Sequence, residues 1–241
     1  MAVPYIHDEI THNPEAASQV LPVLFEIYKP SSILDVGCGL GNWIQVAKQM
    51  GITDVIGVDG SYVDRSLLKI NEQEFVEKDL TQAFQLNRRF DLAISLEVAE
   101  HLPESSAASF IKSITAHADV VLFSAALPGQ GGQNHINEQW PEYWQQHFEH
   151  NGFVMLDCIR PKIWNNNKIE RWYRQNIFLA VKNGHPLAEG NNSTVLSLVH
   201  PELLTAVIQQ QKEKIKKLQA TIEKLKSRDW IGKVARVFKR K

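Results

Sequence analysis

The sequence predicts an α/β protein: a doubly wound, Rossmann-like sheet of seven strands, mostly parallel, with helices on both faces. Two observations predict it. Between residues 30 and 183, short apolar runs alternate with stretches of helical length, which is typical of parallel strands joined by covering helices. A glycine-rich turn also separates the first apolar run from the helix after it. In such sheets ligands bind beyond the carboxyl ends of the strands, so we expect the functional residues just after strands.

The predicted elements follow one another in a regular order. A helix comes first, with Asn13 as its N-cap and Pro14 at its first position, where proline is well tolerated. The last two strands form a closing pair with the final strand antiparallel, joined by an irregular segment, 161–174. The predicted strands are 32–36, 55–59, 75–77, 90–95, 119–124, 153–159 and 176–181, and the main helices are 14–28, 43–50 and 105–117.

The composition limits the class of protein. The 241 residues are 44% apolar and 22% charged, which suits one domain of roughly 150–200 residues plus an appendage. Two cysteines make no disulfide framework and favour a reducing compartment. No apolar run approaches the ~20 residues that span a bilayer, and the N-terminus lacks the pattern of a secretory signal. We therefore expect a cytoplasmic protein.

The formal net charge of −1 conceals two oppositely charged parts. Residues 1–199 hold 14 Lys and Arg against 23 Asp and Glu, a net of −9, whereas residues 200–241 hold 12 against 4, a net of +8. An acidic globular part argues against nucleic acid as its main partner, and we expect none. Breaker-rich sequence between the two parts indicates a linker. The sequence thus predicts a domain at 1–183, a linker at 184–199 and a basic appendage at 200–241.

The glycine-rich turn is segment 34–41, which reads LDVGCGLG. Alternating glycines after a buried strand let the backbone turn tightly and approach a ligand closely. A dinucleotide fingerprint, G-x-G-x-x-G, would need its third glycine where Asn42 stands. Asp35, two residues before the first glycine, would repel a pyrophosphate, but it suits a ligand that carries an ammonium or sulfonium charge.

Residues 30–183 resemble the class I S-adenosylmethionine-dependent methyltransferases, and segment 34–41 matches the first motif of that family. The resemblance implies S-adenosylmethionine as the cofactor, with its amino group oriented by Asp35. It also implies that Asp59 holds the ribose hydroxyls above Gly60, and that Asp79, with Leu80 beside it, reads the adenine. The residues implied to line the methionine end are Gly37, Cys38, Gly39 and Gly41.

Segment 97–103, EVAEHLP, follows the fourth strand, where the transferred methyl group should point. One interpretation is that Glu97 contacts only the cofactor while Glu100 and His101 shape the next helix. The other is a divalent metal site, because the segment is similar to ubiquinone-biosynthesis O-methyltransferases and small-RNA 2′-O-methyltransferases, in which a later histidine completes the cluster. Here that histidine would be His135. Two carboxylates and two imidazoles suit Mg²⁺ or Mn²⁺ with open positions for substrate hydroxyls.

His135 has a second interpretation, as the general base that takes the proton of an alcohol acceptor. With Glu97 it forms the predicted catalytic pair. Its loop, 127–139, is rich in Gly, Gln and Asn and suits a substrate wall. An exposed loop histidine without a role is the remaining alternative.

Aromatic residues, amides and arginines gather in the irregular segment 161–174 and suit a sugar. We therefore predict methylation of a hydroxyl or phosphate oxygen of a bacterial glycan or glycolipid precursor. One alternative is a small-molecule O-methyltransferase acting on a quinone-like acceptor. The other is a non-catalytic scaffold that retains cofactor binding. The residues of the expected acceptor pocket are Trp164, Asn165, Asn166, Asn167, Arg171, Trp172, Tyr173 and Arg174.

The appendage begins with a heptad repeat in residues 204–225, where seam positions recur at alternating spacings of four and three. Ile at a and Leu at d favour a parallel two-stranded coiled coil, so we expect a homodimer; a helix folded onto the domain is the alternative. Further on, residues 230–241 combine an apolar helical face with five cations, a pattern typical of contact with an anionic membrane or an acidic partner. That tail is similar to those of bacterial surface-polysaccharide glycosyltransferases, and it would bring the enzyme to the inner membrane face. The seam is Leu204, Ile208, Gln211, Ile215, Leu218, Ile222 and Leu225.

Overall fold

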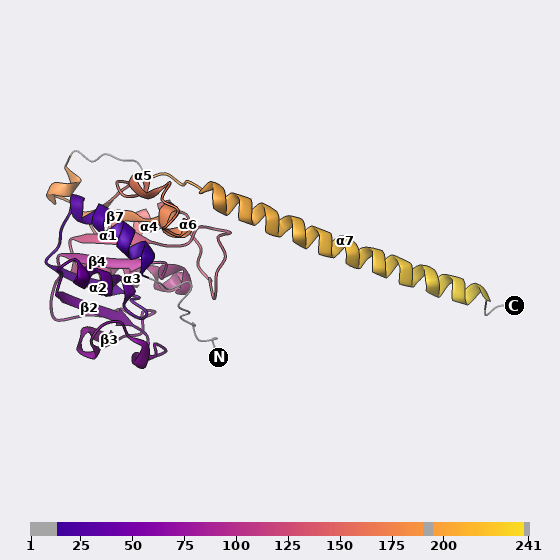
Figure 1. The fold of residues 1–241 in the computed structure, drawn as a ribbon, viewed down its shortest axis with the longest axis horizontal. Coiled ribbons are helices and arrows are strands. Elements are labelled where there is room, and N and C mark those ends of the chain that lie inside the picture. The colour runs from indigo at the N-terminus through magenta and orange to yellow at the C-terminus, as the bar shows by residue number, and fades with distance from the viewer. Residues whose placement is uncertain (1–13, 190–194, 239–241) are drawn as a thin grey trace. The chain divides into compact units, whose positions relative to one another are not determined.

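The computed structural model describes residues 14–189 and 195–238, with side chains as far as residue 226. The chain divides into two compact units, Met1–Leu198 and Val199–Lys241. The first unit contains a seven-stranded sheet in the order β3-β2-β1-β4-β5-β7-β6, which runs upward from β3 to β7 in Figure 1. The strands are β1 Ser32–Val36, β2 Asp54–Asp59, β3 Phe75–Glu77, β4 Leu92–Leu96, β5 Val120–Ser124, β6 Phe153–Leu156 and β7 Phe178–Lys182.

The strand directions confirm the predicted doubly wound sheet. Strands β1 to β5 pair in parallel, whereas β7 is antiparallel to both of its neighbours, β5 and β6. The chain first builds outward from β1 to β3 and then returns to place β4 on the other side of β1. That reversal makes the carboxyl ends of β1 and β4 the switch point, where ligands of such sheets bind.

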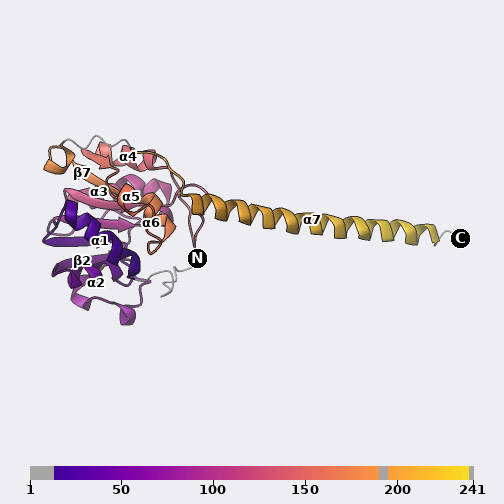
Figure 2. The same ribbon diagram turned by 45° about the horizontal axis from the view of Figure 1, so that its top comes forward.

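Helices cover the two faces of the sheet (Figure 2), and each face carries its own layer of buried apolar side chains. Successive strand residues point to opposite faces, so Ile33 packs in one layer and Leu34 in the other. Helices α1 (Glu15–Ile27), α2 (Asn42–Gln49) and α5 (Arg160–Ile163) contribute to the layer of Ile33. Helices α3 (Ala107–His117) and α4 (Pro141–His150) contribute to the layer of Leu34.

The closing part of the domain differs from the prediction. Segment 161–174 is irregular only over residues 164–170: its two ends belong to α5 and to α6 (Arg171–Asn176), and β7 begins at Phe178 rather than at 176. These helices span four and six residues, too short to show a clear 3.6-residue period. Strand β6 ends at Leu156 because Asp157 turns to pair with Arg160 of α5. The predicted N-cap Asn13 lies outside the described residues.

The end of the predicted linker is held on the first unit. Val195 is buried, and Nη2 of Arg160 donates to the carbonyl oxygen of Leu196 at 2.9 Å. The hydroxyl of Ser197 donates to the two carboxylate oxygens of Glu142 at 2.7 and 2.6 Å. Residues 195–198 therefore belong structurally to the sheet domain.

The second unit contains one long helix, α7 (Pro201–Phe238), and the predicted heptad seam lies along it. Its apolar seam residues are between 45% and 59% exposed. The side chains of the apolar and basic tail, 230–241, lie outside those described. Within the described residues, no helix is both long enough and apolar enough to span a bilayer. The exposed apolar seam residues are Leu204, Ile208, Ile215, Leu218, Ile222 and Leu225.

Candidate active site

The glycine-rich turn forms a cradle between β1 and α2. Gly37 and Gly41 have φ of +82° and +86°, a left-handed conformation that other residues rarely adopt. A Cβ atom on Gly37 would lie 2.3 Å from Val98 Cγ2, and one on Gly41 would lie 2.9 Å from Ile70 Cγ2. Both positions therefore require glycine for two separate reasons. Backbone hydrogen bonds also hold the turn in shape, because the N–H of Gly37 donates to the carbonyl oxygen of Val58 at 2.7 Å and that of Gly41 to the carbonyl oxygen of Cys38 at 2.8 Å.

Asp35 is a buried carboxyl on β1, directly before this cradle. Its Oδ2 has no hydrogen-bond partner in the structure. Burial raises its pKa to about 8, and the charge of Asp59 contributes to the rise. A buried carboxyl oxygen without a partner is costly, and a cationic ligand group would satisfy it. Cys38, which follows in the turn, is also buried, and its thiol donates to the carbonyl oxygen of Gly39 at 3.6 Å.

Asp59, at the end of β2, supports the cradle from the neighbouring strand. Its Oδ2 accepts the N–H of Gly39 at 2.7 Å, and its Oδ1 accepts the N–H of Gly60 at 2.6 Å. The hydroxyl of Tyr62 also donates to Oδ1, at 2.5 Å. Tyr62 is half exposed and lies directly over Gly60. It occupies the outer side of Asp59, and no sequence pattern had singled it out.

Asp79 and Leu80 follow β3, as predicted, but their surroundings differ from each other. Leu80 is buried in the layer of Leu34. Asp79 is exposed, and its Oδ1 accepts the backbone N–H of Thr81 at 2.9 Å and the hydroxyl of Thr81 at 2.7 Å. In this structure the carboxylate stabilises a turn, which is a common role of Asp after a strand.

Glu97, directly after β4, has a left-handed backbone with φ of +55°. Its N–H donates to Ser124, to the carbonyl oxygen at 3.1 Å and to Oγ at 3.0 Å. Its carboxylate accepts Nδ2 of Asn176 at 3.0 Å on one oxygen and Nε2 of Gln130 at 2.7 Å on the other. Burial raises the pKa of Glu97, while these hydrogen bonds and the neighbouring His135 oppose the rise. An unusual backbone held this firmly is typical of functional sites.

Three of the four predicted metal ligands come together. One potential ligand atom from each of Glu100, His101 and His135 lies within 4.8 Å of the others, and the two imidazole rings meet edge to face with centroids 4.8 Å apart. Glu100 is fully buried, and neither of its carboxylate oxygens has a hydrogen-bond partner in the structure. Burial raises its pKa well above the ordinary value, and the charge of Glu97 adds to this. Glu97 itself is not part of this three-residue group.

The loop that carries His135 is folded against this group. The backbone N–H groups of Ile136 and Asn137 donate to the carbonyl oxygen of Glu100 at 2.9 and 3.0 Å. His135 Nδ1 lies 2.9 Å from Oε1 of Glu138. Because a carboxylate only accepts hydrogen bonds, Nδ1 carries the proton and Nε2 is left with a lone pair. The side chain of His135 is 11% exposed, so it is not a solvated loop residue.

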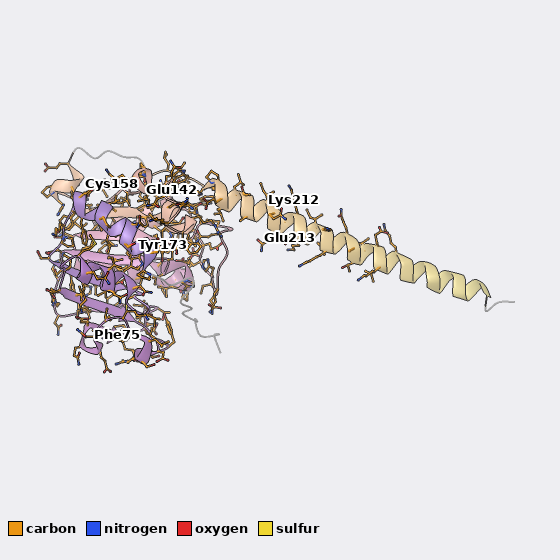
Figure 3. All side chains as sticks on the ribbon, viewed as in Figure 1. Phe75, Glu142, Cys158, Tyr173, Lys212 and Glu213 are labelled. Carbon is orange, nitrogen blue, oxygen red and sulfur yellow. The ribbon has the colours of Figure 1, made fainter. Side chains whose placement is uncertain are left out.

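The predicted acceptor pocket divides into packing residues and one residue near the site. Nδ2 of Asn166 donates to Gln19 of α1 at 3.1 Å, and Nη1 of the buried Arg174 lies 3.4 Å from the carbonyl oxygen of Trp164. These contacts join segment 161–174 to α1 and to itself, so Asn166, Arg174 and Trp164 have a packing role. Tyr173, labelled in Figure 3, lies instead near Glu97, whose charge contributes to raising its pKa.

The environment of Tyr173 links α6 to the cofactor cradle. Its ring contacts that of Trp43, the second residue of α2, at a centroid distance of 5.5 Å. Burial raises its pKa, as do the nearby charges of Glu97 and Glu170. The rings of Tyr173 and Trp172, with centroids 6.1 Å apart, form an aromatic wall, of which Tyr173 lies beside Glu97.

Sequence reasoning missed three residues that complete the site, Gln130, Glu138 and Asn176. Each contacts a predicted site residue, Glu97 or His135. Gln130 and Glu138 lie in loop 127–139, which the sequence predicts as a substrate wall. The spacing of its residues does not indicate which of its side chains point into the site. Asn176 precedes β7 and gave no signal of its own.

Comparison with known proteins identifies the fold family. A family model described as a methyltransferase domain matches residues 9–180. An uncharacterised protein of Haemophilus influenzae is 30% identical over 176 residues. The match covers 69% of this chain and 59% of that relative, so the chain spans less than two thirds of the relative's length.

Two solved structures share the fold at low identity. A sugar N-methyltransferase from Streptoalloteichus has a TM-score of 0.59 at 16% identity, over 76% of this chain and 94% of that chain. The methyltransferase domain of a bacterial Hen1 protein has a TM-score of 0.52 at 17% identity, over 70% and 99%. The family match covers most of the chain, including the glycine cradle and the group around Glu100. The chain belongs to the methyltransferase-domain family.

Proposed function

We propose that this protein transfers a methyl group from S-adenosylmethionine to a hydroxyl or phosphate oxygen of a bacterial glycan or glycolipid precursor. The observation that carries the proposal is the unpartnered Oδ2 of the buried carboxyl of Asp35, beside a cradle that requires glycine at two positions. This pair of features fits the cationic methionine end of S-adenosylmethionine. Asp59 fits the ribose hydroxyls, because its outer oxygen, Oδ1, already accepts a hydroxyl, that of Tyr62.

The methyl-transfer chemistry is assigned to His135 and Glu97. S-adenosylmethionine supplies an electrophilic methyl group, so the protein has to position the acceptor oxygen and take its proton. His135 receives that proton on Nε2, because Glu138 holds the Nδ1–H on the opposite side of the ring. The carboxylate of Glu97, fixed by two amides, accepts a hydrogen bond from the acceptor molecule and orients it.

A divalent cation, Mg²⁺ or Mn²⁺, fits the group of Glu100, His101 and His135. The fit rests on the unpartnered, buried carboxylate of Glu100 and on three donor atoms within 4.8 Å of one another. One carboxylate and two imidazoles form a donor set that binds such cations and leaves positions open. A cation held there would occupy the Nε2 lone pair of His135, and it would take the place of the histidine base by lowering the pKa of a bound hydroxyl. Glu97 borders the group and would complete the four-residue site predicted from the sequence.

The cation proposal has a direct test. We expect a chelator to abolish methyl transfer while leaving the affinity for S-adenosylhomocysteine unchanged, and Mn²⁺ or Mg²⁺ to restore transfer. Glu100→Gln should abolish Mn²⁺ binding measured by calorimetry, whereas Glu104→Gln should not. Full transfer in the presence of chelator would leave His135 as a base without metal.

The acceptor assignment is supported by the wall of Tyr173 and Trp172 beside Glu97. Aromatic faces next to a carboxylate suit a sugar ring with its hydroxyls, whereas a quinone-like acceptor would need a flatter and less polar surface. A non-catalytic scaffold is less well supported, because such a protein has no use for an oriented histidine and a buried carboxylate in its site.

The appendage adds a proposed assembly. The exposed seam on α7 supports a parallel homodimer through residues 204–225, since the heptad spacing places Ile at a and Leu at d. The basic tail, 230–241, would then contact an anionic membrane surface or an acidic partner. Such a dimer would work at the cytoplasmic face of the inner membrane, where glycolipid precursors are found.

One experiment separates the candidate functions. The full-length protein is incubated with radiolabelled S-adenosylmethionine and a bacterial extract that is afterwards fractionated into glycan, lipid and nucleic-acid pools. We expect label in the glycan or glycolipid pool, and none with Gly39→Arg. Label in a quinone fraction would favour the small-molecule alternative, label confined to nucleic acid would end the glycan assignment, and no label together with intact cofactor binding would favour the scaffold.

A further inference from the structure

A closed triangle of hydrogen bonds lies at the centre of the site and joins three distant parts of the chain. Nδ2 of Asn176 donates to Oε1 of Glu97 at 3.0 Å and to Oε1 of Gln130 at 2.8 Å. Nε2 of Gln130 donates to Oε2 of Glu97 at 2.7 Å. The end of β4, the loop 127–139 and the end of α6 thus meet at one carboxylate.

The orientation of Asn176 within this triangle is fixed. Asn176 is 2% exposed, and its Oδ1 accepts Nε2 of Gln175 at 3.0 Å. Its oxygen is therefore turned away from Glu97 and its NH₂ group toward it. A buried polar network is stable only when its members are satisfied, and apolar side chains would fill the same space without that requirement. The arrangement serves the carboxylate rather than the packing.

We propose that Gln130 and Asn176 are positioning residues for Glu97, which hold its carboxylate from both oxygens and couple it to the folded conformation of loop 127–139. The proposal rests on the proposed methyl transfer, because it assigns Glu97 a place beside the acceptor. Neither amide touches the reacting atoms.

The triangle fixes one end of the loop, and Glu100 fixes the other. Gln130 is held by Glu97 near the start of the loop, while Ile136 and Asn137 donate to the carbonyl oxygen of Glu100 near its end. His135 lies between these two attachments. The spacing between Glu97 and His135 therefore depends on Gln130, and releasing it should loosen the loop that carries the base.

The triangle also restricts the chemistry of the acceptor. A carboxylate offers about four acceptor positions, of which Gln130 and Asn176 occupy two. The remaining positions take only hydrogen-bond donors. A sugar hydroxyl has an O–H to donate, whereas an ionised phosphate has only acceptor oxygens. Within the proposed function, the hydroxyl of a neutral sugar is therefore the methylated group.

The test exchanges donor for acceptor without changing size. Asn176→Asp places a carboxylate where an amide donated to Glu97, and Gln130→Glu does the same from the loop. Each should lower methyl transfer by about 10- to 100-fold while the affinity for S-adenosylhomocysteine changes less than about threefold. Asn183→Asp is the matched control, since Asn183 is exposed at the opposite end of β7, and it should transfer at the wild-type rate.

Hydrogen exchange of the backbone amides provides a second readout, which does not need the molecule that accepts the methyl group. In Asn176→Asp the backbone amides of residues 130–137 should exchange hydrogen about tenfold faster than in the wild type. Glu97→Gln combined with Asn176→Asp reverses donor and acceptor and should restore slow exchange, although transfer stays low because Glu97 has been replaced. Gln130→Ala, on the loop, repeats the test should Asn176→Asp fail to fold.

The outcomes separate this inference from the function on which it rests. A wild type that neither binds S-adenosylhomocysteine nor transfers label would overturn the proposed function. Wild-type transfer by a folded Asn176→Asp protein, or unchanged loop exchange in both single variants, would overturn the positioning role. Label in a phosphate-bearing glycan fraction, and none in the neutral fraction, would overturn the assignment of the hydroxyl.

Discussion

Nδ1 of His135 donates a 2.9 Å hydrogen bond to Oε1 of Glu138, three residues further along the chain. The same carboxylate accepts the N–H groups of Gly131 and Gly129, each at 2.7 Å. Glu138 therefore fixes both the shape of the loop and the tautomer of the imidazole. A carboxylate in this relation to a histidine holds its ring in place.

Replacing Glu138 should impair catalysis without affecting the cofactor. In Glu138→Gln one carboxylate oxygen becomes an NH₂ group, which cannot accept an N–H of the loop. We expect methyl transfer to fall by about 10- to 100-fold and the dissociation constant for S-adenosylhomocysteine, measured by calorimetry, to stay the same. Glu149→Gln, on the exposed side of α4, is the control. Equal losses in the two variants would contradict the role of Glu138.

The glycine cradle should not tolerate a side chain. Gly37→Ala adds a Cβ atom 2.3 Å from Val98 and imposes a left-handed backbone on alanine, so we expect binding of S-adenosylhomocysteine to weaken by more than about tenfold. The matched control is Gly51→Ala. Gly51 has φ of +94° with no atom within 4 Å of its Cβ position. It therefore carries the same backbone cost, about 1–2 kcal/mol, without the clash.

These two variants are compared by calorimetry and by thermal unfolding. Gly51→Ala should lower the unfolding temperature and retain full affinity. If Gly51→Ala also loses affinity, the effect of Gly37→Ala is one of stability and the cradle is not the binding site.

The sequence alone predicted the sheet and the cradle because both depend on local patterns. Apolar runs of strand length and a G-x-G-x-G turn are readable within a few residues. The position of Asp79 after β3 was predictable in the same way. The orientation of the Asp79 side chain was not predictable. Whether its carboxylate contacts a ligand or the backbone of Thr81 depends on residues that are distant in sequence and close in space.

The inner polar network could not be predicted for a different reason. Glu97 meets Gln130 across 33 residues of sequence and Asn176 across 79, and a single amide carries no periodic signal. The six-residue helix α6, which delivers Asn176 to the site, was itself read as irregular. Long-range contacts of this kind are decided by the topology of β5 and β7 and not by motifs.

The pKa of Asp35 predicts how cofactor binding depends on pH. In the free protein burial raises this pKa to about 8, so at pH 7 the carboxyl is mostly protonated. The amino group of S-adenosylhomocysteine favours the ionised carboxylate, and binding should therefore release a proton. We expect the affinity to rise between pH 6 and 8, by at most about tenfold per unit. Calorimetry in two buffers of different ionisation enthalpy measures the released proton directly.

Asp35→Asn provides the control and a second readout. In the unfolded chain this carboxyl ionises near 3.8, so between about pH 4 and 8 the folded protein binds more protons than the unfolded one. Its stability should fall as the pH rises through that range, by on the order of 1 kcal/mol per unit. Asp35→Asn should remove this fall as well as the proton release. A wild type whose stability and affinity are flat from pH 5 to 8 would contradict both.

The exposed seam of α7 predicts a dimer. Three isoleucines at a and three leucines at d, each about half exposed in one chain, would bury apolar surface worth several kcal/mol at ~25 cal/mol per Å². Part of this is lost to the entropy of association, so a dimer of moderate affinity is expected. Ile215→Asn with Ile222→Asn replaces two successive a positions and should give a monomer in sedimentation, whereas Ala220→Asn, outside the seam, should not. Cofactor affinity should be the same in all three proteins, because the sheet domain contains the whole cradle.

A dimer carries twice the number of tail cations, each worth roughly 1 kcal/mol near an anionic leaflet, and the monomeric variant should therefore pellet less with anionic vesicles at low salt. A wild type that sediments as a monomer and ignores such vesicles would contradict both parts of the prediction.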